Sequence, residues 1–399
     1  MMNKEYNPKS LLFKIAILSI SIDATVAGVI SGAIPLLADS FKSYPTYVVE
    51  SVPTIPNLTI LIFVVLSSFF TKILGYKKTV LTGLLLSFIS GVAPFFLHNL
   101  YLILLMRALF GAGVGMINPL SYSIISYFYE GDIRAKMYGL ISTVSNFASV
   151  MLTILAGVLL QYSWRFSFLT YFILLIVFVL VLFLVPDFEI NSNSEKDQED
   201  KKRALQNIKL IDRKVLVYGF CMFILFSVFM TINIKLGLLV TGKGYGDATQ
   251  VSFLLSLSNL TGIFIVIIFG VVYKYLKNIL FPIALLVMGI TYFLIANSNS
   301  IILTGVLIVI IAAAFSFLST FIFLRVSELA PKSMNNFVSS MMLVAINLGA
   351  FLCPYFMQGI SSLSGNNTPQ SALIICGIIV LMLLVGYVLS SLFIRNKNI

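Results

Sequence analysis

Two ionisable residues lie deep inside long apolar stretches of this sequence, Asp23 within residues 12–37 and Arg107 within residues 100–127. A charge at the centre of a bilayer costs about 2.5–3.5 kcal/mol even on lenient scales, so such residues are usually functional. A carboxylate that an arginine stabilises and that loss of water destabilises can exchange a proton. We therefore predict that Asp23 binds a proton and that the long Arg107 side chain reaches it. A permanent ion pair and an anion-binding role for Arg107 are the alternatives.

Five asparagines extend this candidate site into other apolar stretches. Asn118 follows Arg107 by eleven residues, which is three helical turns and places both on one helix face. The other four are Asn146, Asn233, Asn259 and Asn347. We predict that the five line a substrate cavity, although any of them could instead bond a neighbouring helix.

The composition indicates that these residues sit in a membrane protein. Of the 399 residues, 59% are hydrophobic and 10% are charged, against about 45–50% and 25% in soluble domains. These values exclude a soluble enzyme, a nucleic-acid binder and a disordered chain. Apolar stretches of helix-spanning length cover residues 12–37, 51–74, 79–97, 100–127, 136–161, 164–186, 214–238, 249–274, 279–297, 300–324, 334–362 and 369–394. We predict an all-α integral membrane protein with twelve transmembrane helices.

Charge sets the orientation and the division of the chain. Most of the 26 lysines and arginines fall in alternate loops, which places both termini in the cytoplasm and makes the net charge of +11 an orientation signal. Residues 187–213 are dense in charges of both signs, so we predict a cytoplasmic linker there, of which residues 204–210 could lie on the membrane. The linker separates two six-helix bundles, residues 1–186 and 214–399.

The two bundles repeat each other at an offset of about 200 residues. The stretch from Ser68 to Lys72 corresponds to the stretch from Gly270 to Lys274, and Asn146 corresponds to Asn347. Glu130 precedes Arg134 by four residues, as Glu328 precedes Lys332. A shared offset predicts two pseudo-symmetric bundles related by an axis along the membrane normal.

This pattern resembles the major facilitator superfamily over the whole chain. The segment Arg107–Gly113 is similar to the span-4 motif of the family, Gly75–Lys78 to the end of its span 2–3 signature, and Trp164–Phe166 to its Trp-Arg-aromatic corner. Two features depart from the family. Lys72 stands where an aspartate is usual, and residues 152–157 lack the Gly-Pro pair of the antiporter signature.

The resemblance implies alternating access, with cytoplasmic loop residues that form a gate. The predicted gating residues are Lys72, Lys77, Glu130, Arg134, Lys274 and Glu328. Ion pairs with nearby bases, including Arg325 and Lys332, are the role we expect for the two glutamates. The branch of drug and metabolite exporters is the nearest match.

Other chemistry has little support in the sequence. His98 is the single histidine, the three cysteines are scattered in apolar runs, and no phosphate-binding glycine loop occurs. We therefore expect no enzyme activity, no metal and no cofactor, with H+ as the coupling ion. The predicted function is a monomeric secondary active transporter of the cell membrane that exports amphipathic compounds or drugs by proton antiport. The alternatives are a symporter or facilitator for uptake of a polar or anionic metabolite, and a sensor of the same fold.

Overall fold

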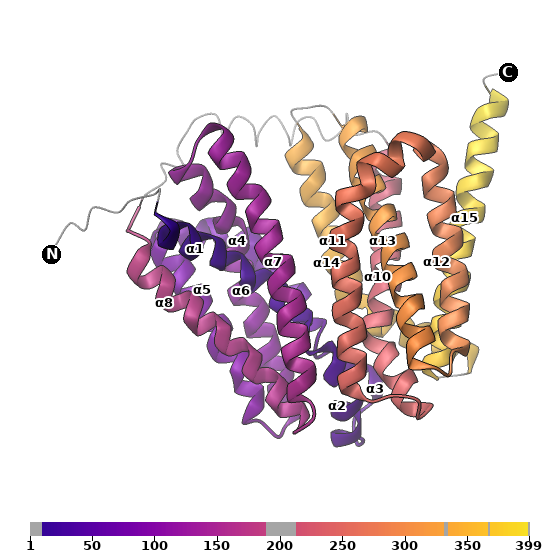
Figure 1. Cartoon of the computed structure of the whole chain (residues 1–399), viewed down its shortest axis with the longest axis horizontal. Helices are drawn as coiled ribbons and strands as arrows, with labels where there is room; N and C mark the ends of the chain where they lie inside the picture. Colours follow the sequence, from indigo (N-terminus) through magenta and orange to yellow (C-terminus); the bar gives the residue numbers. More distant parts are fainter. Residues whose placement is uncertain (1–9, 189–212, 331–333, 366–367, 398–399) are drawn as a thin grey trace. The chain divides into compact units, whose positions relative to one another are not determined.

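The computed structural model describes residues 10–188, 213–330, 334–365 and 368–397. The chain divides into two compact units, Met1–Ser192 and Asn193–Ile399 (Figure 1). The regular elements of the described residues are all helices. This agrees with the predicted fold class. The predicted amphipathic segment 204–210 and most of the predicted linker lie outside the described residues.

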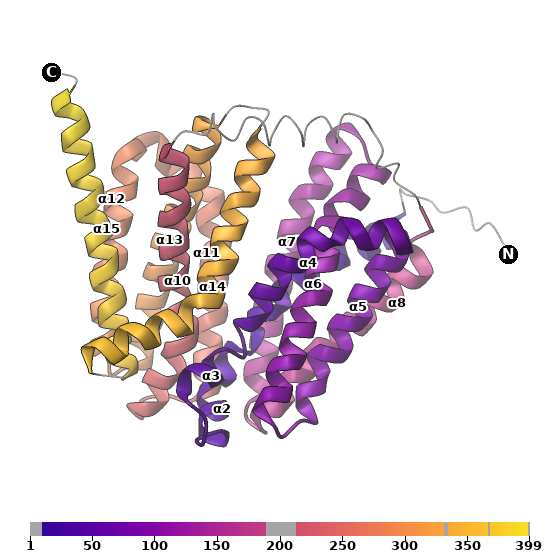
Figure 2. The same cartoon turned by 180° about the vertical axis from the view of Figure 1, so that it is seen from behind.

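The first unit contains a bent first span and five further spans. Its elements are α1 (Leu11–Ser19), the 3-10 helix η1 (Ile20–Ala33), α2 (Ile34–Ser40), α3 (Thr46–Glu50), α4 (Ile55–Leu74), α5 (Tyr76–Val92) with η2 (Ala93–Phe95), α6 (Leu100–Phe128), α7 (Gly131–Leu159), and η3 (Trp164–Phe172) continued by α8 (Ile173–Leu184). The short helices α2 and α3 lie together at one end of this unit (Figure 2).

The second unit contains six long helices. They are α10 (Arg213–Gly242), α11 (Ala248–Leu276), α12 (Leu280–Asn297), α13 (Ile301–Leu329), α14 (Asn335–Ser364) and α15 (Pro369–Lys397), with the short turn η5 (Lys277–Ile279) between α11 and α12. Lys277 has a φ of 46°, and Figure 1 draws α11 and α12 as two separate columns joined at this turn.

The number of spans agrees with the predicted twelve. By length and composition, ten helical stretches can cross a membrane, or eleven with the bent pair Leu11–Asp23 and Thr25–Ser40. One of these stretches, Ala248–Asn297, is 50 residues long and would extend about 75 Å as one helix, more than twice the apolar core of a bilayer. It consists of α11 and α12, so the described residues provide twelve spans.

The two units use the same packing scheme. In the first unit, α6 packs against α4 and α5, η1 packs against α7, and α5 packs against α8. In the second unit, α13 packs against α11 and α12, α10 packs against α14, and α12 packs against α15. Each pair in the first list has its sequence-order counterpart in the second. This is the internal repeat that the sequence offset indicates.

The first span is the element that departs most from a regular α-helix. Fourteen of its residues, Ile20–Ala33, form a 3-10 helix, whereas 3-10 runs longer than three or four residues are uncommon. The two parts of the span meet at 50°. Asp23 lies in this irregular segment, so the residue predicted to carry the chemistry is also where the backbone is unusual.

The end of the first unit includes Phe188, the second residue of the predicted linker. Phe188 is buried, and it joins a core cluster with residues near the start of α1 and the end of α8. The first bundle therefore extends to Phe188, two residues past the predicted boundary, because this aromatic side chain packs on the helices.

Candidate functional site

Arg107 of α6 is fully buried and its guanidinium is held by uncharged groups. Its Nε donates to the Val52 carbonyl at 3.0 Å, Nη1 donates to the Tyr171 hydroxyl at 2.7 Å, and Nη2 donates to the Ala27 carbonyl at 2.7 Å. The guanidinium also lies over the rings of Phe110, at 4.8 Å from the centroid, and Tyr171, at 5.4 Å. Arg107 thus joins four segments of the first unit through hydrogen bonds and cation–π contacts.

Tyr171 completes this arrangement from the sixth span. Its hydroxyl accepts from Arg107 and donates to the Val26 carbonyl at 3.2 Å. Val26 and Ala27 belong to η1, where i→i+3 hydrogen bonds have poorer geometry than those of an α-helix. Arg107 and Tyr171 therefore stabilise the irregular first span by binding two adjacent carbonyls of its backbone. We call these two side chains the Arg107–Tyr171 clasp.

Asp23 is almost fully buried in η1, with 1% of its surface exposed. The Ser87 hydroxyl of α5 lies 3.4 Å from Oδ2, and Oδ1 has no hydrogen-bond partner. The approach of Ser87 depends on Gly113 of α6, because a Cβ at that position would lie 2.4 Å from the Ser87 Oγ. The small residues after Arg107 therefore make room for the group that contacts Asp23.

The direct contact that we expected between Asp23 and Arg107 is not made in this structure. Within the described part of the first unit, the ion pair formed is Lys42–Asp39, and Asp23 takes part in none. Instead, three of the five Arg107 N–H donors bind the carbonyls of Val52 and Ala27 and the hydroxyl of Tyr171. Ala27 nevertheless lies four residues after Asp23, so both side chains act on the same segment of η1.

Glu50 is a buried carboxylate that sequence reasoning missed. It ends the short helix α3, is 1% exposed, and precedes by two residues the Val52 carbonyl that Arg107 binds. The sequence places Glu50 just before the apolar stretch 51–74, where an acid reads as part of a loop. The signal that could have found it is its position directly after the valine pair Val48–Val49 and two residues before Val52.

The predicted cavity asparagines lie on five helices and differ in exposure. Asn118 on α6, Asn233 on α10 and Asn347 on α14 are half-buried, and Asn146 on α7 and Asn259 on α11 are exposed. The Asn347 amide donates to the Leu343 carbonyl at 2.8 Å, a bond within its own helix. That the five share one substrate cavity stays a prediction.

The predicted gating residues lie at helix ends, as the sequence indicates. Lys72 is in the last turn of α4, Lys77 is at the start of α5, and Lys274 is in the last turn of α11. Glu130 is the residue before α7, and its side chain makes no capping hydrogen bond. Within the described residues it forms no ion pair with Arg134. Lys332 lies outside the described residues.

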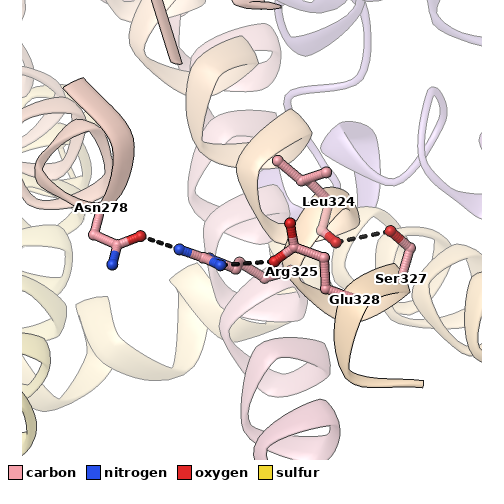
Figure 3. Close-up of polar contacts among 5 residues, drawn as sticks. All are labelled: Asn278, Leu324, Arg325, Ser327 and Glu328. Carbon is pink, nitrogen blue, oxygen red and sulfur yellow. Dashed lines mark hydrogen bonds and ion pairs between the residues drawn. The ribbon is translucent and has the colours of Figure 1, made fainter. Parts of the chain in front are cut away.

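Glu328 does form an ion pair. Its Oε2 lies 2.6 Å from Arg325 Nη1, and Arg325 Nη2 donates to Asn278 Oδ1 in the turn between α11 and α12 (Figure 3). The Arg325 guanidinium also lies over the Phe321 ring at 5.3 Å. This polar link fastens the end of α13 to the α11–α12 turn.

The first unit has an aromatic link at the corresponding place. Phe188 stacks obliquely on Tyr76 at 5.6 Å and on Tyr127 at 5.1 Å, between the start of α5 and the end of α6. Tyr76 and Tyr127 correspond to Asn278 and Arg325 at offsets close to 200 residues. The repeat thus keeps the position of the link and changes its chemistry from polar to aromatic.

The family of the chain follows from its sequence. The profile of the Major Facilitator Superfamily matches residues 16–354. The chain belongs to the Major Facilitator Superfamily. This membership identifies it as a multi-pass membrane transporter that handles small molecules. At the start of the sixth span, the ring nitrogen of Trp164 donates to Ser40 Oγ at 2.8 Å and so ties this span to the end of the first.

Solved structures of superfamily transporters share the fold at low sequence identity. The nucleoside transporter NupG, as a mutant, aligns with a TM-score of 0.77 and 13% identity, over 94% of this chain and 99% of that one. The POT family transporter PepTSo gives 0.70 and 11%, over 97% and 98%. The xylose transporter XylE from E. coli gives 0.69 and 17%, over 93% and 94%. The exporter-like branch that we expected is not distinguished by these relatives.

Proposed function

We propose that this superfamily transporter exports amphipathic organic compounds in exchange for protons, with Asp23 as the residue that carries the proton. The observation behind the proposal is the state of the Asp23 carboxyl, which is buried and has one oxygen without a hydrogen-bond partner. An ionised carboxylate in that environment would pay a large desolvation cost, so this pocket favours the protonated acid. Release of the proton then requires a second arrangement that gives the carboxylate water or a positive partner.

Arg107 is the nearest candidate for that partner, through an exchange of hydrogen bonds. In this structure its guanidinium binds backbone carbonyls of Val52 and Ala27. If η1 rewound toward an α-helix, the backbone donor to the Ala27 carbonyl would change from residue i+3 to residue i+4, and the redirected carbonyl would release Nη2 toward the carboxylate. Protonation of Asp23 would then be linked to the conformation of the first span, which is what coupled transport requires.

The same contacts support export of amphipathic compounds over capture of anions by Arg107. Three of the five N–H donors of this guanidinium bind Val52, Tyr171 and Ala27, and the side chain is fully buried, so a substrate carboxylate or phosphate does not reach it in this arrangement. The side chains of Asn146 and Asn259 are exposed. They fit the wall of a water-filled cavity, because an amide that faces lipid loses its hydrogen bonds to water. These features favour a substrate that is bound mainly by apolar and neutral polar groups.

The test is transport by the purified protein in sealed vesicles with an imposed pH gradient. A fluorescent amphipathic cation should accumulate when the gradient is present and stop accumulating when a protonophore collapses it. Asp23→Asn should lose gradient-driven accumulation and keep binding and exchange of the probe. Asp39→Asn is the matched control, since that carboxylate is exposed and pairs with Lys42 at the surface. Full gradient-driven transport by Asp23→Asn would contradict the proposal.

Uptake of a polar or anionic metabolite, by symport or facilitation, is the second candidate. It is supported by the absence of the Gly-Pro pair from residues 152–157 and by structural relatives that carry nucleosides, peptides and xylose. In the same vesicles, a nucleoside, dipeptide or sugar that moves together with protons, while the amphipathic probe does not move, would favour this candidate.

A further inference from the structure

Two cysteines and a methionine of the second unit are linked by buried contacts, either directly or through Thr231. The Cys376 thiol of α15 lies 4.0 Å from the Met357 sulfur of α14, and the Cys353 thiol of α14 lies 3.4 Å from the Thr231 hydroxyl of α10. Thr231 is also a hydrogen-bond neighbour of Cys376. We call this group the Cys353–Met357–Cys376 cluster. It lies where α10, α14 and α15 pack on one another.

The geometry of α14 directs two of the sulfurs to one place. Cys353 and Met357 are four residues apart on the same helix, so their side chains share a face. Cys376 projects from the neighbouring helix, and all three residues are at most 2% exposed. Both thiols are reduced. The cluster is therefore a set of soft donor atoms shielded from water, formed by residues that lie 4 and 19 positions apart in sequence.

The hydrogen atom of the Cys376 thiol marks where a cation would sit, and the Cys353 hydrogen has a different partner. Thr231 donates its hydroxyl hydrogen to the Ser227 carbonyl at 3.2 Å, which leaves the Cys353 thiol as the donor in its contact with Thr231. The Cys376 thiol donates to the Met357 sulfur. A cation that replaces this second hydrogen would lie between two sulfurs. Three ligands at about 2.3 Å around one ion are about 4 Å apart, close to the observed sulfur–sulfur separation.

The donor set selects the class of metal. Thiolate and thioether ligands prefer soft ions such as Cu(I), whereas Mg²⁺ and Ca²⁺ need oxygen ligands. The described residues contain no group of three His, Cys, Asp or Glu that could hold a metal ion, so the site depends on the methionine as its third ligand. Silver(I), which has the same charge and softness, is the natural probe analogue.

We propose that the Cys353–Met357–Cys376 cluster binds one monovalent soft metal ion of the Cu(I) class. Binding displaces the Cys376 thiol proton to solution, while Cys353 keeps its proton toward Thr231 and offers a sulfur lone pair, so the new positive charge and the one new thiolate cancel and the buried site stays neutral overall. No electron is transferred, because the ion enters as Cu(I). Tyr292 lies near both thiols but is not a ligand, since its hydroxyl donates to the Val228 carbonyl at 2.8 Å.

The experiment is a Cu(I) titration of the reduced full-length protein in detergent, under anaerobic conditions, against a chromogenic Cu(I) chelator. We expect one ion per chain and an affinity that falls about tenfold for each unit by which the pH is lowered, because one proton is displaced. Cys376→Ser and Cys353→Ser should each weaken binding by at least 100-fold. Cys221→Ala is the matched control, because this half-buried cysteine is not part of the cluster, and its affinity should stay within twofold of the wild type.

Met357→Leu tests the third ligand with a side chain of similar volume that keeps the packing. X-ray absorption should report three sulfur neighbours at about 2.3 Å in the wild type and two in this variant. Silver(I) should raise the thermal midpoint of the wild type and of Cys221→Ala, and leave that of Cys376→Ser unchanged. Binding that survives both serine substitutions, or that is lost in Cys221→Ala, would overturn the proposal. None of these measurements depends on transport.

Discussion

Arg107 and Tyr171 share a 2.7 Å hydrogen bond in the interior of the first unit, and each of them also holds one carbonyl of the first span. The buried positive charge is therefore satisfied by a phenol and by backbone oxygens. This pairing explains how a span with fourteen residues of 3-10 helix can persist inside a packed bundle. It also makes the clasp a sensitive place for substitution.

Removal of the tyrosine hydroxyl should destabilise the first unit. Tyr171→Phe keeps the ring under the guanidinium and deletes an acceptor for Arg107 and a donor to Val26. Leaving such buried groups unsatisfied costs about 1–3 kcal/mol, so the thermal midpoint in detergent should fall by several degrees. Tyr162→Phe is the control, because Tyr162 is 75% exposed. Equal midpoints for the two variants would show that the clasp contributes nothing to stability.

The small residues after Arg107 should tolerate a methyl group poorly. At Gly111 a Cβ would lie 2.3 Å from the Pro56 carbonyl oxygen and 2.7 Å from its Cα, both backbone atoms of α4 that cannot rotate away. Gly111→Ala should therefore cost about 1–3 kcal/mol through overpacking, measured as a lower thermal midpoint and lower yield of folded protein.

Gly139→Ala on α7 is the matched control for this substitution. No atom lies within 4 Å of a Cβ at that position, and alanine favours a helix by about 1 kcal/mol over glycine. The control should be neutral or slightly stabilising. A fall in midpoint as large as that of Gly111→Ala would place the cost in the helix backbone and not in the contact between α4 and α6.

Loss of the polar link between Arg325, Glu328 and Asn278 should change the turnover rate of transport more than it changes thermal stability. The Glu328 side chain is 46% exposed, so its ion pair is screened and contributes less than about 1 kcal/mol. Glu328→Gln and Asn278→Ala should leave the thermal midpoint nearly unchanged and alter the turnover rate non-additively in the double variant. Arg134→Gln, at a base without an ion pair within the described residues, should show no such coupling.

A capping box begins α11. The Asp247 side chain accepts from the Gln250 backbone at 2.8 Å, and the Gln250 side chain accepts from the Asp247 backbone at 3.1 Å. Asp247→Ala should lower stability by about 1 kcal/mol. Ser300→Ala is the control, because Ser300 precedes α13 but makes no side-chain capping bond. Circular dichroism during thermal unfolding gives the thermal midpoint of each variant. A fall in midpoint for Asp247→Ala that is no larger than that for Ser300→Ala would contradict the expectation.

The sequence predicted the spans well because their length and apolar character depend on local composition. The break in the first span was not predicted, since nothing local in Ile20–Ala33 requires a 3-10 helix. Two carbonyls of that segment are bound by Arg107 and Tyr171, which come from the fourth and sixth spans. The sequence indicates that Arg107 is buried, but two of its three partners are backbone carbonyls, which have no sequence signature. Glu50 was missed for a related reason, because its burial comes from packing at the end of the unit.

The 3-10 conformation also makes η1 longer than an α-helix of the same residues would be. A 3-10 helix rises about 2.0 Å per residue and an α-helix about 1.5 Å, so fourteen residues differ by about 7 Å between the two forms. Rewinding of this one segment would shorten the distance between α1 and α2 by more than the pitch of one α-helical turn. The first span of this transporter is thus in its longer form, and Arg107 and Tyr171 bind the backbone of the segment that makes it longer.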